Sequence, residues 1–423
     1  MEDDAHMTLP AEESVTIEDI VKARARIQGR VRETPMLPNT LLTERVGASV
    51  SLKCENLQRT GSFKLRGALN VIGELEGSAG VIAASAGNHA QAVALAAAER
   101  GIPALILMPK DAPIAKQRAT LGYGAEVMLV DGPLATCIDE ARVMARERGL
   151  LFVPPFDLPG IVAGQGTVGL EIVEQAPDVE TVIVPAGGGG LLAGIALAVK
   201  SRRPQAKVIG VQTKAMPGIV ASLTSGAPLK VSAARTMADG VAVAGPSTLT
   251  FDLIRRYVDD VVTVSEETIA QAIVFLIERA RLVAEGAGAM GVAALMSGAV
   301  QSPGRTVAVV SGGNIDVNTL GRLVSRGLLV EGRHRTLTVA AANVAGEMSL
   351  ISTALASAGA NILEVRHELI TVDLPVGVAR LVFRVEVAGA EAWDALLSAL
   401  SEGGLQPGTA TDFVTPAAAA MPW

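Results

Sequence analysis

The residues with the clearest chemical implication are four consecutive glycines, Gly187 to Gly190, which follow a β-branched run that begins at Thr181. An Ala-rich segment comes directly after them, so the pattern predicts a strand, a turn and a helix. Such a turn exposes backbone N–H groups at the positive end of a helix, and no Cβ obstructs a ligand. The segment therefore predicts a phosphate-binding site, and the alternative is a Gly-rich turn without a ligand.

The same segment also fits the dinucleotide spacing G-x-G-x-x-A, with Gly188, Gly190 and Ala193 at the three positions, so NAD is an alternative ligand. A ribose-binding Asp or Glu is then expected about 20 residues farther on. The next strand-like run ends in Gln212 instead, which argues against NAD.

A second candidate site is the segment from Ser85 to Gln91, which reads S-A-G-N-H-A-Q and follows a short strand-like run. Small residues leave backbone N–H groups free to hold a carboxylate, and Asn88 offers a neutral hydrogen-bonding side chain. The segment is suited to holding an amino acid. A lone histidine at a helix start is more often a cap or a core residue than a catalyst, so we assign His89 backbone contacts alone.

A third candidate is Lys64, which stands beside Phe63 and near a helix start expected at Ser62. An amine desolvated against apolar surface loses proton affinity and becomes nucleophilic toward an aldehyde. By composition alone, a structural or solvated lysine is the alternative. A fourth candidate, Ser311, follows the strand-like run Thr306 to Val310 and places a hydroxyl at the carboxyl edge of the sheet, where α/β folds bind ligands.

The elements that position these residues alternate between short β-branched runs and Ala-rich helical stretches. This alternation predicts an α/β fold with a parallel, doubly wound sheet. Strong helix formers fill His89 to Arg100 and Leu191 to Lys200, as expected of crossover helices. The expected strands are Val81 to Ala84, Ala104 to Met108, Glu126 to Val130, Thr181 to Val184, Lys207 to Val211 and Thr306 to Val310.

After Arg326 the pattern changes to β-α-β-β-α-β, the order of a small ferredoxin-like α+β domain. We expect a linker between Ser325 and His334, and a flexible tail over 409–423 because its residues have little to pack with. The expected strands are 335–343, 362–370, 378–387 and a weak one near Leu405, and the expected helices are 347–358 and 391–401.

Composition excludes several classes of protein. The length of 423 residues allows a large catalytic region and an appended domain. A net charge of -7 without a basic stripe opposes a nucleic-acid partner. Cys54 and Cys137 are far apart and have no neighbouring His, so we expect neither a disulfide framework nor a metal site, and a cytoplasmic location fits best. An acidic, polar start and the lack of a long apolar run oppose secretion and membrane spanning.

Taken together and in this order, the segments resemble the threonine and serine dehydratases of the fold type II pyridoxal 5′-phosphate (PLP) enzymes, also called the tryptophan synthase β-like group. The resemblance runs from about Ile17 to Leu328. It rests on Ser62-Phe-Lys-Leu-Arg-Gly-Ala68, Ser85-Ala-Gly-Asn-His-Ala-Gln91, Gly187 to Leu191, Met237-Ala-Asp-Gly240, Glu285-Gly-Ala-Gly-Ala289 and Ser311-Gly-Gly-Asn314.

The resemblance implies a domain organisation. A flexible N-terminus, 1–15, would precede a catalytic region, 16–328, made of two open, mostly parallel sheet domains. The smaller of these, about 54–155, would be inserted in the larger. The C-terminal domain, 334–408, would follow.

The resemblance also implies roles for individual residues. Lys64 would be the catalytic residue and carry PLP as a Schiff base, Phe63 would pack at the cofactor ring, Asn88 would bond its phenolic oxygen and Ser311 its pyridine nitrogen. The cofactor phosphate would lie on the backbone of Gly187, Gly188, Gly189, Gly190 and Leu191. The substrate would contact Ser85, Ala86, Gly87, Asn88, His89, Gln165 and Gly240, and Glu285 would be a pocket residue without an assigned role.

The implied reaction converts L-threonine to 2-oxobutanoate and ammonia, and L-serine to pyruvate. Lys64, once released from the cofactor, would act as the general base at the substrate Cα, and the hydroxyl would leave from Cβ. The motifs contain no obvious side-chain acid, so the family suggests the cofactor phosphate as the proton donor. A hydroxyl at Ser311 leaves the ring nitrogen unprotonated, which favours elimination.

Three alternatives stay open. The serine racemases of this group carry a serine directly before the Gly-Asn-His run, where this chain has Ala86, and hold a divalent metal with acidic residues after the strand that ends at Val211. The residues at that place here are Gln212, Thr213, Lys214 and Met216. A β-replacement enzyme would share the fold, and a catalytically silent amino-acid sensor would have no need of Lys64.

The C-terminal domain resembles an ACT domain, a ferredoxin-like unit that commonly binds amino acids at paired interfaces. Ala358-Gly-Ala-Asn-Ile362 matches its helix-to-strand corner. The first loop, Asn343-Val-Ala-Gly-Glu347, departs from the usual Asp-x-Pro-Gly turn. The resemblance therefore implies an amino-acid effector or a role in dimerisation, in a homodimer or a homotetramer.

Overall fold

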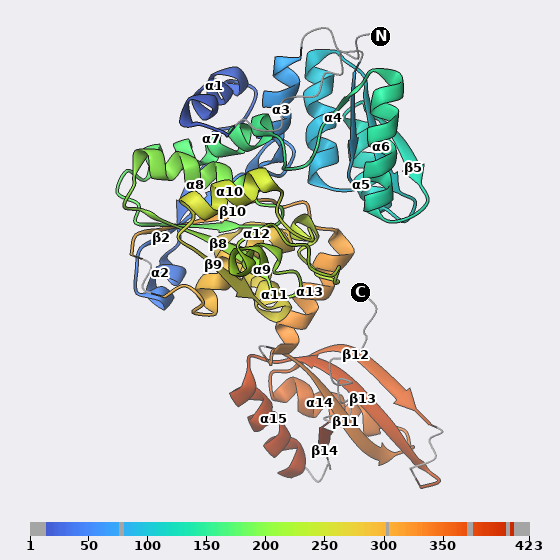
Figure 1. Ribbon diagram of the computed structural model, residues 1–423. Helices are drawn as coiled ribbons and strands as arrows, with labels where there is room; N and C mark the ends of the chain where they lie inside the picture. The colour runs from blue at the N-terminus through green and yellow to red at the C-terminus, as the bar shows by residue number, and fades with distance from the viewer. Residues whose placement is uncertain are drawn as a thin grey trace, which may run out of the picture. The chain divides into compact units, whose positions relative to one another are not determined.

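The computed structural model describes residues 14–75, 80–301, 304–330, 332–369, 375–402 and 407–409. The chain divides into two compact units, Met1–Asp316 and Val317–Trp423, and Figure 1 labels most of the helices and strands of each. The domain limits given by the sequence stay a prediction, and the expected linker overlaps the end of a helix, α13 (Val317–Val330). The expected flexible ends lie outside the described residues, apart from 14, 15 and 409.

The larger sheet of the first unit has the strand order β1-β2-β10-β7-β8-β9. β1 pairs with β2 in antiparallel fashion, and every other pair is parallel. The last strand of the unit in sequence, β10, thus lies between β2 and β7. The strands are β1 (Met36–Pro38), β2 (Val50–Cys54), β7 (Thr181–Pro185), β8 (Lys207–Thr213), β9 (Asp260–Val264) and β10 (Thr306–Val310).

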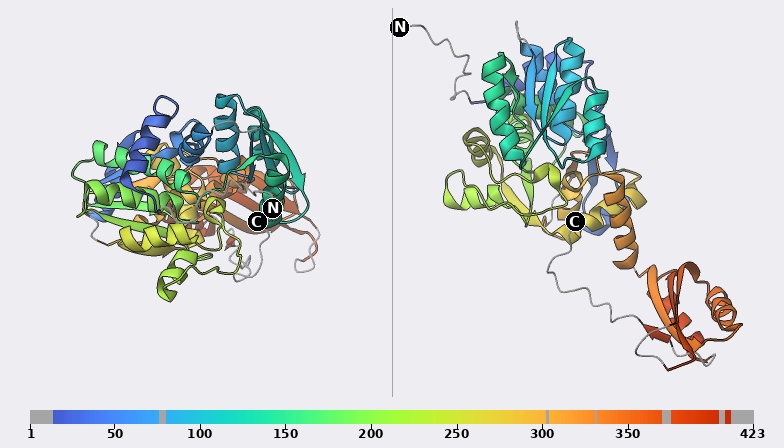
Figure 2. Two further views of the ribbon diagram at one scale, coloured as in Figure 1. Left: turned by 45° about the horizontal axis from the view of Figure 1, so that its top comes forward. Right: turned by 90° about the vertical axis from the view of Figure 1, so that its right-hand side faces the viewer.

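The smaller sheet is fully parallel, with the order β5-β4-β3-β6. In sequence it lies between β2 and β7. Its residues alternate between the two faces, as the period of a strand requires: Val81 and Ala83 join one hydrophobic cluster, and Ile82 and Ala84 another. The right-hand view in Figure 2 shows helices on both faces of this sheet. The strands are β3 (Val81–Ala84), β4 (Ala104–Pro109), β5 (Glu126–Val130) and β6 (Leu151–Phe152).

Helices cover both sheets of the first unit. The α-helices are α1 (Ile17–Ile27), α2 (Thr40–Val46), α3 (Lys64–Glu74), α4 (Asn88–Arg100), α5 (Ile114–Gly122), α6 (Leu134–Arg148), α7 (Pro159–Gln175), α8 (Gly190–Arg202), α9 (Gly218–Ser225), α10 (Thr248–Tyr257), α11 (Glu266–Phe275) and α12 (Gly286–Met296). Three shorter elements are η1 (Glu55–Leu57), η2 (Asp239–Val241) and the π-helix η3 (Leu276–Ala280).

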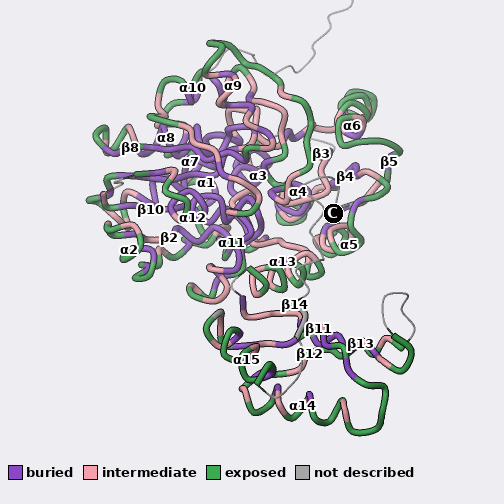
Figure 3. Tube along the Cα trace, turned by 90° about the horizontal axis from the view of Figure 1, so that it is seen from below, coloured by how far each residue is buried: buried purple, intermediate pink, exposed green. Residues whose placement is uncertain are grey.

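Helices α7 and α8 form the centre of this unit and are mostly buried, as the purple tube in Figure 3 shows. Glycines allow this packing because they remove side chains where backbones approach closely. A Cβ at Gly194 of α8 would lie 2.5 Å from the Val162 carbonyl oxygen of α7, and a Cβ at Gly164 would lie 2.6 Å from Gly67 Cα of α3. The three helices therefore pack against one another through these backbone contacts.

A buried network of charges joins β2, η1, α3 and α7. Arg66 donates to both oxygens of Glu55, at 2.8 and 2.9 Å, and to both oxygens of Glu171, at 2.6 and 2.9 Å. Lys53 Nζ donates to Glu171 at 2.6 Å and to the Thr34 carbonyl oxygen at 2.7 Å. Two cations thus face two carboxylates, with the side chains of Lys53, Arg66 and Glu55 fully buried. The network fixes the N-terminal half of α3, two residues after Lys64.

The second unit contains the predicted β-α-β-β-α-β order. Its antiparallel sheet has the strand order β12-β13-β11-β14, as expected of a ferredoxin-like domain. Besides α13, the elements are β11 (His334–Ala342), α14 (Glu347–Ser357), β12 (Asn361–Glu368), β13 (Val378–Glu386), α15 (Ala390–Glu402) and β14 (Pro407–Thr409). The weak strand predicted near Leu405 corresponds to β14, although Leu405 itself lies outside the described residues.

The six strands predicted for the catalytic region are all confirmed, with ends that differ by at most two residues. The start of one helix differs from the prediction: α3 begins at Lys64 rather than at Ser62, and Phe63 is its N-cap residue. No helix in the described ranges is long and apolar enough to cross a membrane.

Candidate active site

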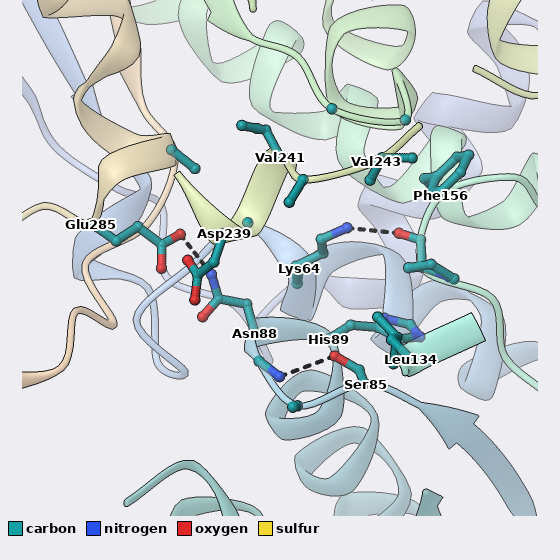
Figure 4. A pocket seen from close by; sticks show the side chains of 18 of the residues that line it. Lys64, Ser85, Asn88, His89, Leu134, Phe156, Asp239, Val241, Val243 and Glu285 are labelled. Carbon is teal, nitrogen blue, oxygen red and sulfur yellow. Dashed lines mark hydrogen bonds between the residues drawn. The ribbon is translucent and has the colours of Figure 1, made fainter. Parts of the chain in front are cut away.

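A pocket of about 440 Å³ opens at the carboxyl ends of the strands in the first unit. It is lined by the segments that follow β3, β7 and β10 and by the N-terminal ends of α3, α4 and α8. Figure 4 shows its charged and polar side chains. The structure brings together all the site residues predicted from sequence, namely Phe63, Lys64, Ser85, Ala86, Gly87, Asn88, His89, Gln165, Gly187, Gly188, Gly189, Gly190, Leu191, Gly240, Glu285 and Ser311.

Lys64 is the first residue of α3 and projects into the pocket. Its Nζ donates a hydrogen bond to the Pro155 carbonyl oxygen at 2.8 Å and lies 5.2 Å from the centre of the Phe63 ring. Burial lowers the pKa of Lys64 to about 8, although the carboxylates of Glu285 and Asp157 oppose the shift. A larger fraction of this amine is therefore unprotonated near neutral pH than of an ordinary lysine, which makes it a better nucleophile and base.

The four glycines form a cradle at the N-terminus of α8. Gly189 has a φ of +95°, in the left-handed region that favours glycine. A Cβ at Gly188 would lie 2.5 Å from the Phe156 ring. The first helical bond runs from Ala193 N–H to the Gly189 carbonyl, so the N–H groups before it have no partner within the helix. These free donors at a positive helix end suit a phosphate group.

The loop after β3 turns sharply into α4. Ser85 Oγ accepts a hydrogen bond from Gly87 N–H at 3.1 Å, which stabilises the turn. His89 Nε2 bonds the Val153 carbonyl oxygen at 2.8 Å. Burial lowers the pKa of His89 to about 3, and Lys64 adds to the shift. His89 is therefore neutral near pH 7, as expected of a structural residue rather than a proton carrier.

Asn88, the first residue of α4, and Glu285, the residue before α12, lie side by side at the pocket and are hydrogen-bonded. Asn88 Nδ2 donates to Glu285 Oε1 at 2.7 Å, and Asn88 Oδ1 accepts from Asn314 Nδ2 at 2.8 Å. Burial raises the pKa of Glu285 to about 7, and the nearby carboxylate of Asp239 adds to the rise, whereas the Asn88 hydrogen bond opposes it. Glu285 thus titrates in the neutral range.

Two polar groups of the pocket have no partner in the described part of the chain. Gln165 Oε1 is buried without a hydrogen bond. Ser311 lines the pocket, and it is the backbone carbonyl of this residue, not its hydroxyl, that accepts a hydrogen bond from Phe63 N–H. Such orphaned groups are uncommon in protein interiors. Together with the glycine cradle and the lysine, they fit PLP, whose phosphate, pyridine nitrogen and aldehyde require these three kinds of partner.

Sequence reasoning missed an ion pair at the pocket wall. Lys116 on α5 and Asp239 in η2 form this pair, and both line the pocket. The pair joins the part of the unit built on the smaller sheet to the part built on the larger one. Asp239 lies within the motif that ends at Gly240, but nothing near Lys116 in sequence marks it, because the two residues are 123 positions apart. Pro155 and Phe156 also line the pocket, and no local sequence pattern marks them either.

Gln212 argues against NAD, and Gln212 with Thr213 argues against a racemase metal site. Both side chains make structural hydrogen bonds. Gln212 Oε1 accepts hydrogen bonds from Ile219 N–H at 2.9 Å and Val220 N–H at 3.1 Å, so its side chain caps the N-terminal end of α9 rather than facing a ribose. Thr213 Oγ1 donates to Glu266 at 2.7 Å. Among the residues that the structure describes, no group of three or more His, Cys, Asp or Glu side chains could hold a metal ion.

Known proteins resemble this chain over most of its length. An L-threonine ammonia-lyase of Thermotoga maritima is 46% identical over 376 residues, which cover 88% of this chain and 94% of that protein. The catabolic L-threonine dehydratase TdcB of Escherichia coli K12 is 45% identical over 315 residues, or 73% of this chain and 96% of that protein.

Solved structures agree on the fold. A threonine deaminase from T.th. superposes with a TM-score of 0.69 at 40% identity, over 71% of this chain and 99% of that one. A maize serine racemase superposes with a TM-score of 0.71 at 34% identity, over 75% of this chain and 99% of that one. The family model described as pyridoxal-phosphate dependent enzyme matches residues 27–312. This match covers more than half of the chain and confirms the predicted fold type and cofactor: the chain belongs to the pyridoxal-phosphate dependent enzymes.

Proposed function

We propose that this protein is an L-threonine ammonia-lyase that also acts on L-serine, releasing 2-oxobutanoate or pyruvate together with ammonia. The observation that carries the proposal is the position of Lys64. Its amine, with a pKa lowered to about 8, lies in one pocket with the glycine cradle and the loop from Ser85 to His89. The relatives named threonine ammonia-lyase and threonine dehydratase support the same reaction.

The pocket residues divide the work. PLP, when bound, supplies an aldehyde for an amine and a conjugated ring that withdraws electrons from the Cα of an amino acid. Gly187 to Leu191 hold its phosphate through backbone N–H groups, and Ser311 Oγ holds its ring nitrogen. Asn88 Nδ2 donates to its phenolic oxygen, and Phe63 packs at its ring.

Lys64 has two tasks in this proposal. It anchors the cofactor, and it removes the proton at the substrate Cα as the general base. The lowered pKa suits both tasks, because each requires a neutral amine. The backbone N–H groups of the Ser85 to His89 loop orient the substrate carboxylate, and Gln165 and Gly240 line the same space.

The test is the release of 2-oxobutanoate from L-threonine by the purified protein with PLP, compared with Lys64→Ala. We expect the variant to lose activity by more than about 10⁴-fold, because both the anchor and the base are gone. A Lys64-dependent visible absorbance band should accompany activity. A wild-type protein that has this band but forms no oxo acid from threonine or serine would overturn the proposal.

A serine racemase is the second candidate, favoured by the likeness to the maize enzyme. Ala86 opposes it, because its methyl group cannot donate or accept a proton at the substrate. Chiral chromatography of the reaction with L-serine separates the two readings: D-serine would indicate a racemase, and pyruvate a lyase. Cysteine formed when sulfide is added, or an S-substituted cysteine formed when a thiol is added, would indicate β-replacement.

The second unit and the two cysteines carry proposals beyond the reaction. The second unit has the strand order and connections of a ferredoxin-like domain, so we propose that 334–408 is an ACT-like domain that binds an amino-acid effector or pairs subunits in a homodimer or homotetramer. Both cysteines are free and buried, which supports a cytoplasmic location. Light scattering with and without a panel of L-amino acids would test the assembly and its effector.

A further inference from the structure

The side chain of Asn88 is held from two directions. Its oxygen accepts from Asn314 Nδ2 at 2.8 Å, and its nitrogen donates to Glu285 Oε1 at 2.7 Å. The Asn314 amide is itself oriented, because its Nδ2 also donates to the Thr60 carbonyl oxygen at 2.7 Å. A flipped Asn88 amide would place two donors against each other at Asn314, so only one orientation satisfies both neighbours.

Glu285 is a rigid partner for this amide. It is the residue before α12, and its backbone N–H donates to the Gly312 carbonyl oxygen at 3.1 Å. Its side chain lies between Gly240 and Gly312, where an added Cβ would contact Oε1 at either position. With 5% of its surface exposed, Glu285 has little room to take another position.

This arrangement leaves one hydrogen-bonding group of Asn88 for a ligand. Nδ2 has two N–H groups, of which one is bound to Glu285. The other has no partner among the described residues, and Asn88 lines the pocket. The Asn88 side chain therefore presents a donor, which suits an anionic or partly negative oxygen of a ligand.

We propose that Glu285 is a positioning residue that acts through Asn88, fixing the amide so that this N–H points to the phenolic oxygen of PLP. The inference rests on the proposed cofactor roles and adds one for Glu285. Because Oε1 must remain an acceptor, a proton bound by Glu285 sits on Oε2. Protonation thus changes the charge next to Asn88 without releasing its amide.

The charge on Glu285 depends on groups from three other elements. Asp239 in η2 favours the protonated form, whereas Lys116 on α5 and Lys64 on α3 favour the carboxylate. As pH rises through about 7, the carboxylate forms and places a negative charge beside the donor that would hold an anionic oxygen. The affinity for PLP should therefore contain a component that falls with rising pH near this value.

The test is a double-mutant cycle on cofactor affinity, measured by titrating cofactor-free protein with PLP and following the visible absorbance band of the bound cofactor, without substrate. Glu285→Ala should weaken PLP binding about tenfold in the wild-type background, or about 1.4 kcal/mol. In the Asn88→Ala background the same change should have less than about a twofold effect, because the group it positions is gone. Equal losses in both backgrounds would overturn the proposal.

Glu285→Gln is the matched variant, because its amide oxygen can still accept from Asn88 while the charge is lost. We expect its PLP affinity to stay within about threefold of the wild type, and the inflection near pH 7 to disappear. If Glu285→Ala does not fold, this variant alone decides: a retained inflection, or a loss as large as that of Asn88→Ala, contradicts the proposal. A protein that shows the coupling but releases no oxo acid would overturn the proposed function and leave this inference standing.

Discussion

Lys64 and Arg66 are two positions apart on the same helix, α3, yet they lie in opposite kinds of environment. Arg66 is fully buried and meets two carboxylates with four hydrogen bonds. Burial favours its neutral form, but Glu55 and Glu171 outweigh burial and raise its pKa above the ordinary range. Lys64 meets one backbone carbonyl, and burial lowers its pKa to about 8.

A structural charge and a reactive one thus differ in the number of their anionic partners. A buried cation with enough anionic partners keeps its proton, whereas a desolvated amine without a bonded carboxylate loses its proton at a lower pH than an ordinary lysine does. Gln165 resembles Lys64 in this respect, because its buried oxygen has no hydrogen-bond partner among the residues that the structure describes. Gln165 lines the pocket, where a ligand can satisfy its oxygen.

The largest expected effect on stability is at Arg66. Arg66→Met removes one cation and leaves Glu55 and Glu171 buried with too little positive charge, so the free energy of unfolding should fall by about 3 to 5 kcal/mol. Urea denaturation measures the change. The matched control is Arg255→Met, whose ion pair with Asp252 is exposed and should contribute less than about 1 kcal/mol. A loss at Arg66 no larger than that at Arg255 would mean that the network does not hold α3.

Lys64→Met should raise the free energy of unfolding of the cofactor-free protein, whereas Arg66→Met lowers it. The Lys64 pKa is lowered on folding from 10.5 to about 8, so between these values the unfolded chain binds a proton that the folded chain does not. The wild type therefore gains stability as pH rises from about 8 toward 10.5. Below about pH 8, Lys64→Met should be more stable than the wild type by roughly 1 to 3 kcal/mol.

This difference should shrink as pH rises through that window, and urea denaturation at a series of pH values checks it. Glu18→Gln, an exposed change on α1, controls for the general effect of pH. A Lys64→Met variant that is less stable than the wild type at every pH would show that Lys64 contributes to the fold like Arg66.

The change in the free energy of unfolding should be smallest for the ion pair at the pocket wall. Lys116 and Asp239 form an ion pair that is 20% and 56% exposed, so Lys116→Met should lower the free energy of unfolding by less than about 1 kcal/mol. The pair joins parts of the unit built on different sheets, however. We therefore expect a rise of a few-fold in KM for threonine with kcat little changed. Steady-state kinetics would contradict this if KM were unchanged in both Lys116→Met and Asp239→Asn.

Sequence reasoning identified the pocket because its motifs are local. Gly187 to Gly190 and the loop from Ser85 to His89 each combine a strand end, small residues and a helix start within a few positions. The predicted strands were found for the same reason, since each is a short apolar run. Their chemical roles stay predictions until a variant is tested.

What the sequence did not reveal depends on distant partners. β2 was not predicted, because Lys53 in the run Val50 to Cys54 looks out of place in a buried strand until Glu171, 118 positions away, is seen beside it. The raised pKa of Glu285 likewise depends on burial and on Asp239 from another element. Pairings of this kind have no local pattern in a single sequence.

The place of β10 has a consequence for how the chain folds during synthesis. Val50 of β2 pairs with Thr306 of β10, and β10 also pairs with β7. The ribosome makes the chain from its N-terminus. The β2–β10 and β10–β7 pairs therefore cannot form until nearly the whole first unit has been made. The smaller sheet, whose strands all lie between Val81 and Phe152, can form much earlier. Nascent chains stopped before Thr306 should therefore carry a finished small sheet beside open strand edges, a state that favours aggregation.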